Sequence, residues 1–99
     1  MAQKYVAHFG RCVARRVFHS RSKQRRLRKA TVEIGTPAAV PGSDWGCRVR
    51  IRGLSTEADR TVFDVDSVQA LSIALMNSGL MVTSSREFLE GRLHLWDSP

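Results

Sequence analysis

Acidic residues are absent from the first thirty positions of this sequence, which hold ten lysine and arginine residues. The first acid is Glu33, and residues 31–99 carry nine acidic and six basic side chains. The formal net charge of +7 is therefore concentrated in the N-terminal third. Such asymmetry predicts contact with an acidic partner, namely nucleic acid, an anionic surface or an acidic protein face. The alternative is a solvated basic segment that keeps the protein in solution.

Cysteine is also scarce, because Cys12 and Cys47 are the only two and lie 35 residues apart. This spacing matches no zinc site and no Cys-x-x-Cys redox motif. The N-terminal residues lack the run of about seven or more apolar residues that a secretory signal needs. The longest uncharged stretch, residues 67–85, contains eight polar residues and is not typical of a membrane span. We therefore expect a cytoplasmic protein with free thiols and no membrane partner.

No group of residues indicates catalysis. A Cys–His pair needs a reactive thiol, whereas Cys47 belongs to the apolar side of an expected strand, where cysteine is usually an inert small hydrophobe. The three histidines, His8, His19 and His94, do not have the spacing of metal ligands. No glycine-rich segment fits a phosphate-binding loop. We therefore predict a non-enzymatic protein without catalytic residues, cofactor or metal.

The clearest structural signal is the alternation of residues 45–52, which is typical of a strand with two different faces. One face would carry Trp45, Cys47, Val49 and Ile51. The other would carry Gly46, Arg48, Arg50 and Arg52. Because strand side chains alternate between faces, the apolar set would meet a core and the arginines would meet solvent or a partner.

The remaining segments complete a single α+β domain over residues 1–99. We expect a four- to five-stranded antiparallel sheet with one helix packed on its apolar face, because short connections favour antiparallel neighbours. The first ten residues fit either an extra edge strand or a partly ordered arm. The expected elements are a basic β-hairpin over residues 11–34, a loop over 35–44, two strands within 45–65, a helix over 66–82 and a final strand over 86–96.

The expected helix begins at Asp66, which is a favourable N-cap residue, with Gln69 three positions later. Val68, Leu71 and Leu75 form an apolar stripe with Ala74 beside it. The helix has no charged residue on its other side, unlike most helices that cover a small sheet. Either the loop or the N-terminal arm covers that side, or it is an interface with a partner or with a second copy through residues 67–82.

Three segments resemble motifs of a family of small bacterial proteins of unknown function. They are residues 44–47 (Asp-Trp-Gly-Cys), 51–54 (Ile-Arg-Gly-Leu) and 65–71 (Val-Asp-Ser-Val-Gln-Ala-Leu). The shared pattern is Asp-Trp-x-Cys, Ile-x-Gly-Leu and Val-Asp-Ser-x-Gln-Ala-Leu, and the likeness covers roughly residues 12–96. These motifs are a strand, a turn and a helix cap, so the resemblance implies a fold and no activity. The basic run of residues 21–29 lies outside the pattern.

The candidate binding site is the set of basic residues on the hairpin and on the alternating strand. Its members are Arg15, Arg16, Arg21, Lys23, Arg25, Arg26, Arg28, Lys29, Arg48, Arg50 and Arg52. Our first hypothesis is an adaptor, inhibitor or regulator that engages an acidic macromolecule through these residues. The alternative function is direct, largely non-specific nucleic-acid binding, although aromatic residues that stack on bases are scarce in these segments. A third interpretation pairs the strand arginines with sheet acids such as Glu33 and Asp64.

Overall fold

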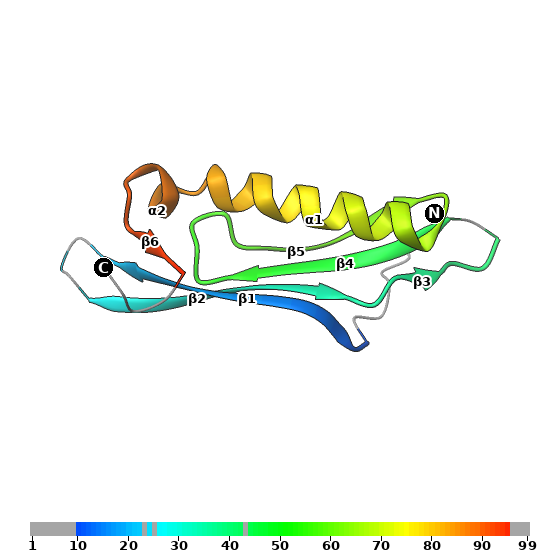
Figure 1. The fold of residues 1–99 in the computed structure, drawn as a ribbon, viewed down its shortest axis with the longest axis horizontal. Coiled ribbons are helices and arrows are strands. Elements are labelled where there is room, and N and C mark those ends of the chain that lie inside the picture. Colours follow the sequence, from blue (N-terminus) through cyan, green and yellow to red (C-terminus); the bar gives the residue numbers. More distant parts are fainter. Residues whose placement is uncertain (1–9, 23, 25, 43, 96–99) are drawn as a thin grey trace, which may run out of the picture.

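The computed structural model describes residues 10–22, 24, 26–42 and 44–95. It consists of one antiparallel sheet with a long helix on one face, so the predicted α+β class is confirmed (Figure 1). The strands are β1 (Cys12–Arg21), β2 (Leu27–Gly35), β3 (Ala38–Ala39), β4 (Trp45–Arg52), β5 (Ala58–Asp64) and β6 (Leu93–His94). The helices are α1 (Ser67–Thr83) and α2 (Arg86–Leu89). The prediction for residues 1–10 lies, except for Gly10, outside the described residues.

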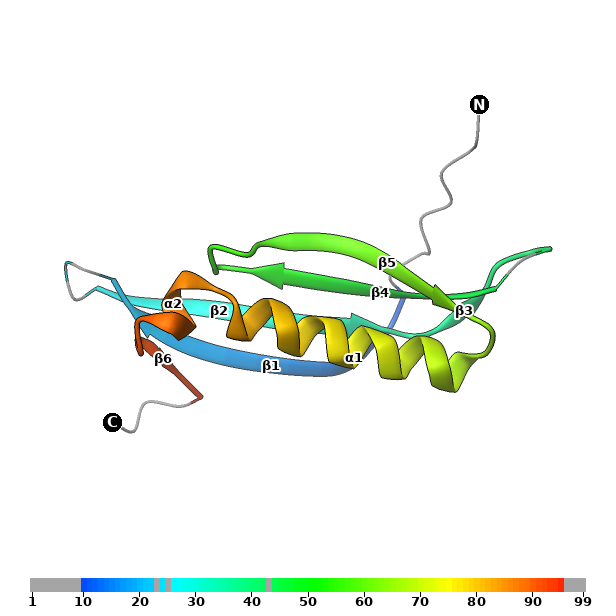
Figure 2. The ribbon, with the colours of Figure 1, turned by 90° about the horizontal axis from the view of Figure 1, so that it is seen from above.

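The strands lie side by side in the order β5, β4, β2, β1 and β6, and β3 continues the line of β2 beside the start of β4. The basic hairpin forms as expected, since β1 pairs with β2 from Arg21 opposite Leu27 to Cys12 opposite Gly35. The views from the side and from above show its turn at one end of the molecule (Figures 1 and 2). The end of β1 and the start of β2 therefore lie at the opposite end of the molecule from the start of α1.

Two segments differ from the expectation. The strand expected over residues 86–96 is wrong for its first part, where Ser85 caps a short helix by accepting a hydrogen bond from the Phe88 backbone N–H (3.2 Å). Only Leu93 and His94 then pair with β1. The loop over 35–44 contains the two-residue strand β3. The short strands β3 and β6 depend on pairing with distant strands, which local patterns do not encode, whereas the cap of α2 is local.

The N-cap of α1 is the one predicted. Asp66 has an extended backbone, and its Oδ1 accepts a hydrogen bond from the Gln69 backbone N–H at 2.8 Å. The helix runs to Thr83, one residue beyond the expected end, and Gly79 lies within it.

The predicted apolar stripe of this helix is wrong for Val68 and Leu75, whereas Leu71 packs against the core and Ala74 is fully buried. The helix buries Ala70, Ala74, Ser78 and Val82, whereas Val68 remains 71% exposed and Leu75 is also exposed. Small side chains let a helix backbone lie close to a sheet, and the bulkier residues then remain on the flanks and the outer side. The loop does not cover that outer side, and any cover by residues 1–9 lies outside the described residues.

The core lies between α1 and the central strands. The apolar face of β4 was predicted correctly, because Cys47, Val49 and Ile51 are fully buried and pack with Val32 and Ile34 of β2. Contacts of α1 are mainly with β4 and β5 and only slightly with β2. Consequently α1 does not cover the face of β1 that lies on the helix side of the sheet.

Candidate functional site

One row of alternating charges crosses the sheet face that points away from α1, called here the open face. Arg15 on β1 lies opposite Glu33 on β2, Glu33 opposite Arg50 on β4, and Arg50 opposite Asp59 on β5. An Arg50 Nη2 donates to Glu33 Oε1 at 3.1 Å, and Arg15 Nε lies 3.9 Å from Glu33 Oε2. The row is thus a cross-strand ladder of opposite charges, which stabilises an exposed sheet face.

Arg48 is paired with Asp59 in a two-point contact. Its Nε donates to Oδ1 at 2.7 Å and its Nη2 donates to Oδ2 at 2.8 Å. This hydrogen-bonded pair raises the pKa of the Arg48 guanidinium and lowers the pKa of the Asp59 carboxyl, which the charges of Arg50 and Arg52 lower further.

The interpretation that sheet acids neutralise the strand arginines is therefore correct for Arg48 and Arg50. Glu33 was named correctly, but Asp64 was not. Asp64 lies on the helix side of the sheet opposite Trp45, and its Oδ1 accepts a hydrogen bond from the Val65 backbone N–H at 2.7 Å. The acid that serves this role is Asp59, because strand register decides which residues are opposite each other.

A second group of cations gathers at the turn end of the β1–β2 hairpin. We call it the hairpin cluster, and it consists of Arg21, Arg26, Arg28, Lys29 and Arg52, all of them exposed. Arg52 joins it because it lies opposite Thr31 at the end of β4. Within the described part of the chain, no acidic side chain forms an ion pair with a member of the cluster. Lys23 and Arg25 lie outside the described residues.

Arg92 borders this cluster and was missed by sequence reasoning. It donates from Nη1 to the Arg21 carbonyl oxygen at 2.6 Å and forms an ion pair with Glu90, also at 2.6 Å. These contacts tie the segment before β6 to the end of β1. No local signal connects residues 71 positions apart, and only the fold reveals this support of the hairpin.

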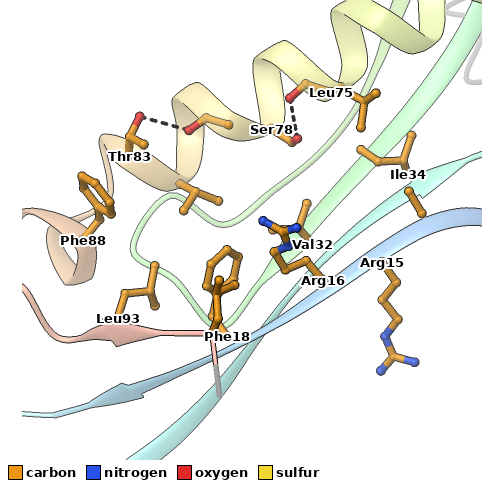
Figure 3. Close-up of a pocket in the computed structure, with 14 residues that line it drawn as sticks. Arg15, Arg16, Phe18, Val32, Ile34, Leu75, Ser78, Thr83, Phe88 and Leu93 are labelled. Carbon is orange, nitrogen blue, oxygen red and sulfur yellow. Dashed lines mark hydrogen bonds between the residues drawn. The ribbon is translucent and has the colours of Figure 1, made fainter. Parts of the chain in front are cut away.

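Arg16 lies on the opposite face of β1 from Arg15. It lies opposite Val32 on the helix side of the sheet, and Figure 3 shows its side chain directed into a groove while Arg15 is directed away. The groove has a volume of about 600 Å³ and is bounded by β1, β2, α1, α2 and β6. Its walls are mainly apolar and include Phe18, Val32, Leu75, Phe88 and Leu93. The mixed faces of β1 gave no signal for this groove in the sequence.

The two thiols differ in burial and are not linked to each other. Cys47 is fully buried, its Sγ–H points to the Gly35 carbonyl oxygen at 3.3 Å, and burial raises the pKa of its thiol. Cys12 is partly buried, and the two cysteines are not linked. His19 and His94 lie opposite each other on β1 and β6. Among the residues that the structure describes, no three potential ligands gather in a way that would hold a metal ion.

Comparison with known proteins places this arrangement in a family. The sequence model for a domain of unknown function (DUF6968) matches residues 14–99, which include the whole sheet except the first two residues of β1. The chain belongs to the DUF6968 family. No curated protein and no solved structure matches the chain. In the described part of this DUF6968 protein, neither helix has the length and apolar character needed to traverse a bilayer.

Proposed function

We propose that this DUF6968 protein is a small non-enzymatic binding protein, acting as an adaptor, inhibitor or regulator, whose hairpin cluster engages an acidic protein surface. One observation carries the proposal. The cations of the cluster are exposed and form no ion pair with a described acidic residue, whereas Arg48 and Arg50 on the same sheet are paired. The cluster is therefore a group of exposed cations at one end of the sheet that form no ion pair within the described residues. Cations arranged in this way favour an anionic partner.

The composition of the cluster favours a protein over a nucleic acid. Leu27 lies among the basic residues and is 57% exposed, opposite Arg21 at the end of the hairpin. An apolar contact surrounded by cations suits a protein interface, because such interfaces combine an apolar centre with a polar rim. Phe18, the only phenylalanine, tyrosine or tryptophan in the hairpin, lines the groove instead. The hairpin therefore offers no aromatic platform for stacked bases.

A second copy of the chain is a further proposed partner, through the outer side of α1. Met76 is 64% exposed and Leu80 is similarly exposed, and no charged residue occurs in this helix. An uncharged apolar surface allows two copies that both carry a net charge of +7 to approach each other. Sedimentation equilibrium should show a dimer that Met76→Glu dissociates, and a wild-type chain that stays monomeric at high concentration would refute this pairing.

We also propose that the protein works in a bacterial cytoplasm. The resemblance of residues 44–47, 51–54 and 65–71 to motifs of small bacterial proteins supports a bacterial origin. The two unlinked cysteines suit a reducing compartment. Fractionation of the source cell with an antibody to the chain tests the compartment, and recovery from the secreted fraction would contradict it.

The binding proposal is tested with two fluorescent probes across a salt series. One probe is a peptide of alternating glutamate and leucine, and the other is a single-stranded or double-stranded oligonucleotide. The test variant replaces Arg26, Arg28 and Lys29 with Gln. The control replaces Arg11, Arg60 and Arg86 with Gln and so removes the same charge from exposed positions elsewhere.

We expect the peptide to bind the wild type and the control variant, and to bind the hairpin variant at least about tenfold more weakly. An equal loss of peptide affinity in both variants would show that binding depends only on net charge, and it would contradict the proposal. Oligonucleotide binding that is tighter than peptide binding and falls steeply with salt would support the nucleic-acid alternative instead, because neutralised phosphates release counterions.

A further inference from the structure

The groove beside α1 has apolar walls on both of its sides. Phe18, Val32 and Ile34 contribute from the sheet, and Leu75 and Val82 contribute from α1. Phe88 of α2 and Leu93 of β6 close it toward one end (Figure 3). Its volume of about 600 Å³ lies within the range of small-molecule sites. An apolar ligand body in this groove would displace water from both walls, which is the main source of affinity in such sites.

The hydroxyl groups along the helical wall already have acceptors within α1. Ser78 donates its hydroxyl hydrogen to the Leu75 carbonyl oxygen at 2.8 Å, and Thr83 donates to the Gly79 carbonyl oxygen at 3.0 Å. Figure 3 shows both bonds directed along the helix and not across the groove. These hydroxyls consequently have no hydrogen left to donate to a ligand and offer it only acceptor lone pairs, so the acceptor atoms of a sugar or a nucleoside would find no donors on this wall.

Arg16 is the exception to this apolar lining. Its guanidinium is directed into the groove, and no acidic residue in the described ranges forms an ion pair with it. Arg15, its neighbour in sequence, also borders the groove with part of its atoms but directs its guanidinium to the open face beside Glu33. The groove thus combines one cation that lacks a described acidic partner with an extended apolar wall.

We propose that the groove binds an amphipathic carboxylate, namely an alkyl or acyl chain with a single anionic head. The chain lies between α1 and β1–β2, and the carboxylate accepts hydrogen bonds from the Arg16 guanidinium. A planar guanidinium matches a carboxylate in a two-point contact, and this match sets the class of head group. The site lies on the opposite face of the sheet from the charge ladder and does not depend on the hairpin cluster.

The test uses the full chain and the dye 1-anilinonaphthalene-8-sulfonate, whose apolar rings and single sulfonate mimic the proposed ligand. Competitors of equal chain length are decanoate, decanol and decylamine, used below their micelle concentrations. We expect decanoate to displace the dye best and decylamine worst. Along a series from octanoate to tetradecanoate, affinity should rise about two- to fourfold with each added CH₂ until the groove is filled.

Two adjacent residues provide matched variants. Arg16→Gln should weaken decanoate at least about tenfold and leave decanol unchanged. Arg15→Gln removes the same charge from the other face of the strand and should change neither ligand. Both side chains are exposed, so neither substitution threatens the fold.

Three results would overturn the proposal. The first is no displacement by any of the three competitors. The second is a decanoate preference that survives in Arg16→Gln. The third is a loss of the decanoate preference in Arg15→Gln as large as that in Arg16→Gln, which would show that the preference depends only on net charge. Failure of the peptide experiment on the hairpin cluster leaves these outcomes unaffected, since the variants do not overlap.

Discussion

Arg48 and Asp59 form a two-point ion pair across β4 and β5, with N–O distances of 2.7 Å and 2.8 Å. The pair is diagonal, because the residue directly opposite Arg48 is Thr61 and the residue opposite Asp59 is Arg50. The Asp59 carboxylate therefore pairs with the guanidinium of Arg48, although Arg48 is not the residue directly opposite it. This geometry makes Arg48 and Arg50 part of a structural ladder of charges, whereas the cations of the hairpin cluster form no ion pair with a described acid.

The contribution of this pair to stability should depend on pH. The folded state lowers the pKa of Asp59 below the value of about 3.9 in an unfolded chain. Its stabilisation is therefore fully present above about pH 4 and is lost as the pH falls through the lower folded-state pKa. Because the Asp59 side chain is 45% exposed, solvent screening limits the effect to about 0.2–1 kcal/mol.

Urea unfolding of Asp59→Asn against the wild type checks this expectation. The difference in the free energy of unfolding should be present at pH 7 and should decrease as the pH is lowered below about 4. Asp44→Asn is a suitable control, because Asp44 is exposed and its backbone carbonyl oxygen accepts a hydrogen bond from the Val40 N–H, which the substitution keeps. A difference that persists unchanged at low pH would show that the pair is not the cause.

Gly53 and Gly79 should respond in opposite directions to alanine. Gly53 has a φ of +88°, and a Cβ placed on it would lie 2.5 Å from the Lys29 carbonyl oxygen. We expect Gly53→Ala to destabilise the fold by about 2 kcal/mol or more, from backbone strain and this contact. Gly79 is inside α1 with nothing within 4 Å of a Cβ, so Gly79→Ala should stabilise it by about 0.5–1 kcal/mol. Thermal unfolding of both variants tests these two expectations. Shifts of the melting temperature of the same sign and similar size would contradict them.

The orientation of α1 can be tested by changing one buried and one exposed residue. Ala74 is fully buried against the sheet, so Ala74→Leu should overpack the interface and cost about 1–3 kcal/mol. Val68 is mostly exposed, and Val68→Ala should change the free energy of unfolding by less than about 0.5 kcal/mol. Chemical denaturation measures both. A large loss with Val68→Ala would restore the stripe of Val68, Leu71 and Leu75 as the buried side.

The two thiols should differ in reactivity. Burial raises the pKa of Cys47 and shields its sulfur, while Cys12 is only partly buried. Titration with a disulfide reagent at pH 8 should therefore modify one thiol quickly in the folded protein and both in denaturant. Cys12→Ser should remove the fast phase. Fast modification of Cys47 in the folded Cys12→Ser variant would show that the core around β4 opens readily.

Several features could be predicted from local sequence because backbone geometry repeats every few residues. The alternation of Trp45 to Arg52 indicated both the strand and its buried face, since strand side chains alternate regardless of what surrounds them. Asp66 marked the start of α1, because a carboxylate that accepts backbone N–H bonds acts within one turn. The hairpin followed from two strand-forming segments joined by a short polar turn.

The remaining features depend on elements that are distant in the sequence. Asp59, and not Asp64, balances the arginines because the register of β4 against β5 is set by their pairing as a whole. Ala74 and not Leu75 meets the sheet because the helix rotates to the closest packing. The groove exists because α1 covers β4 and β5 and leaves β1 open. The sequence by itself determined the main strands, the start of α1 and the buried face of β4, because these depend on backbone geometry that repeats every few residues. The tertiary structure decided which side of α1 is buried and which charges are paired, because covering and pairing are relations between elements that only their packing establishes.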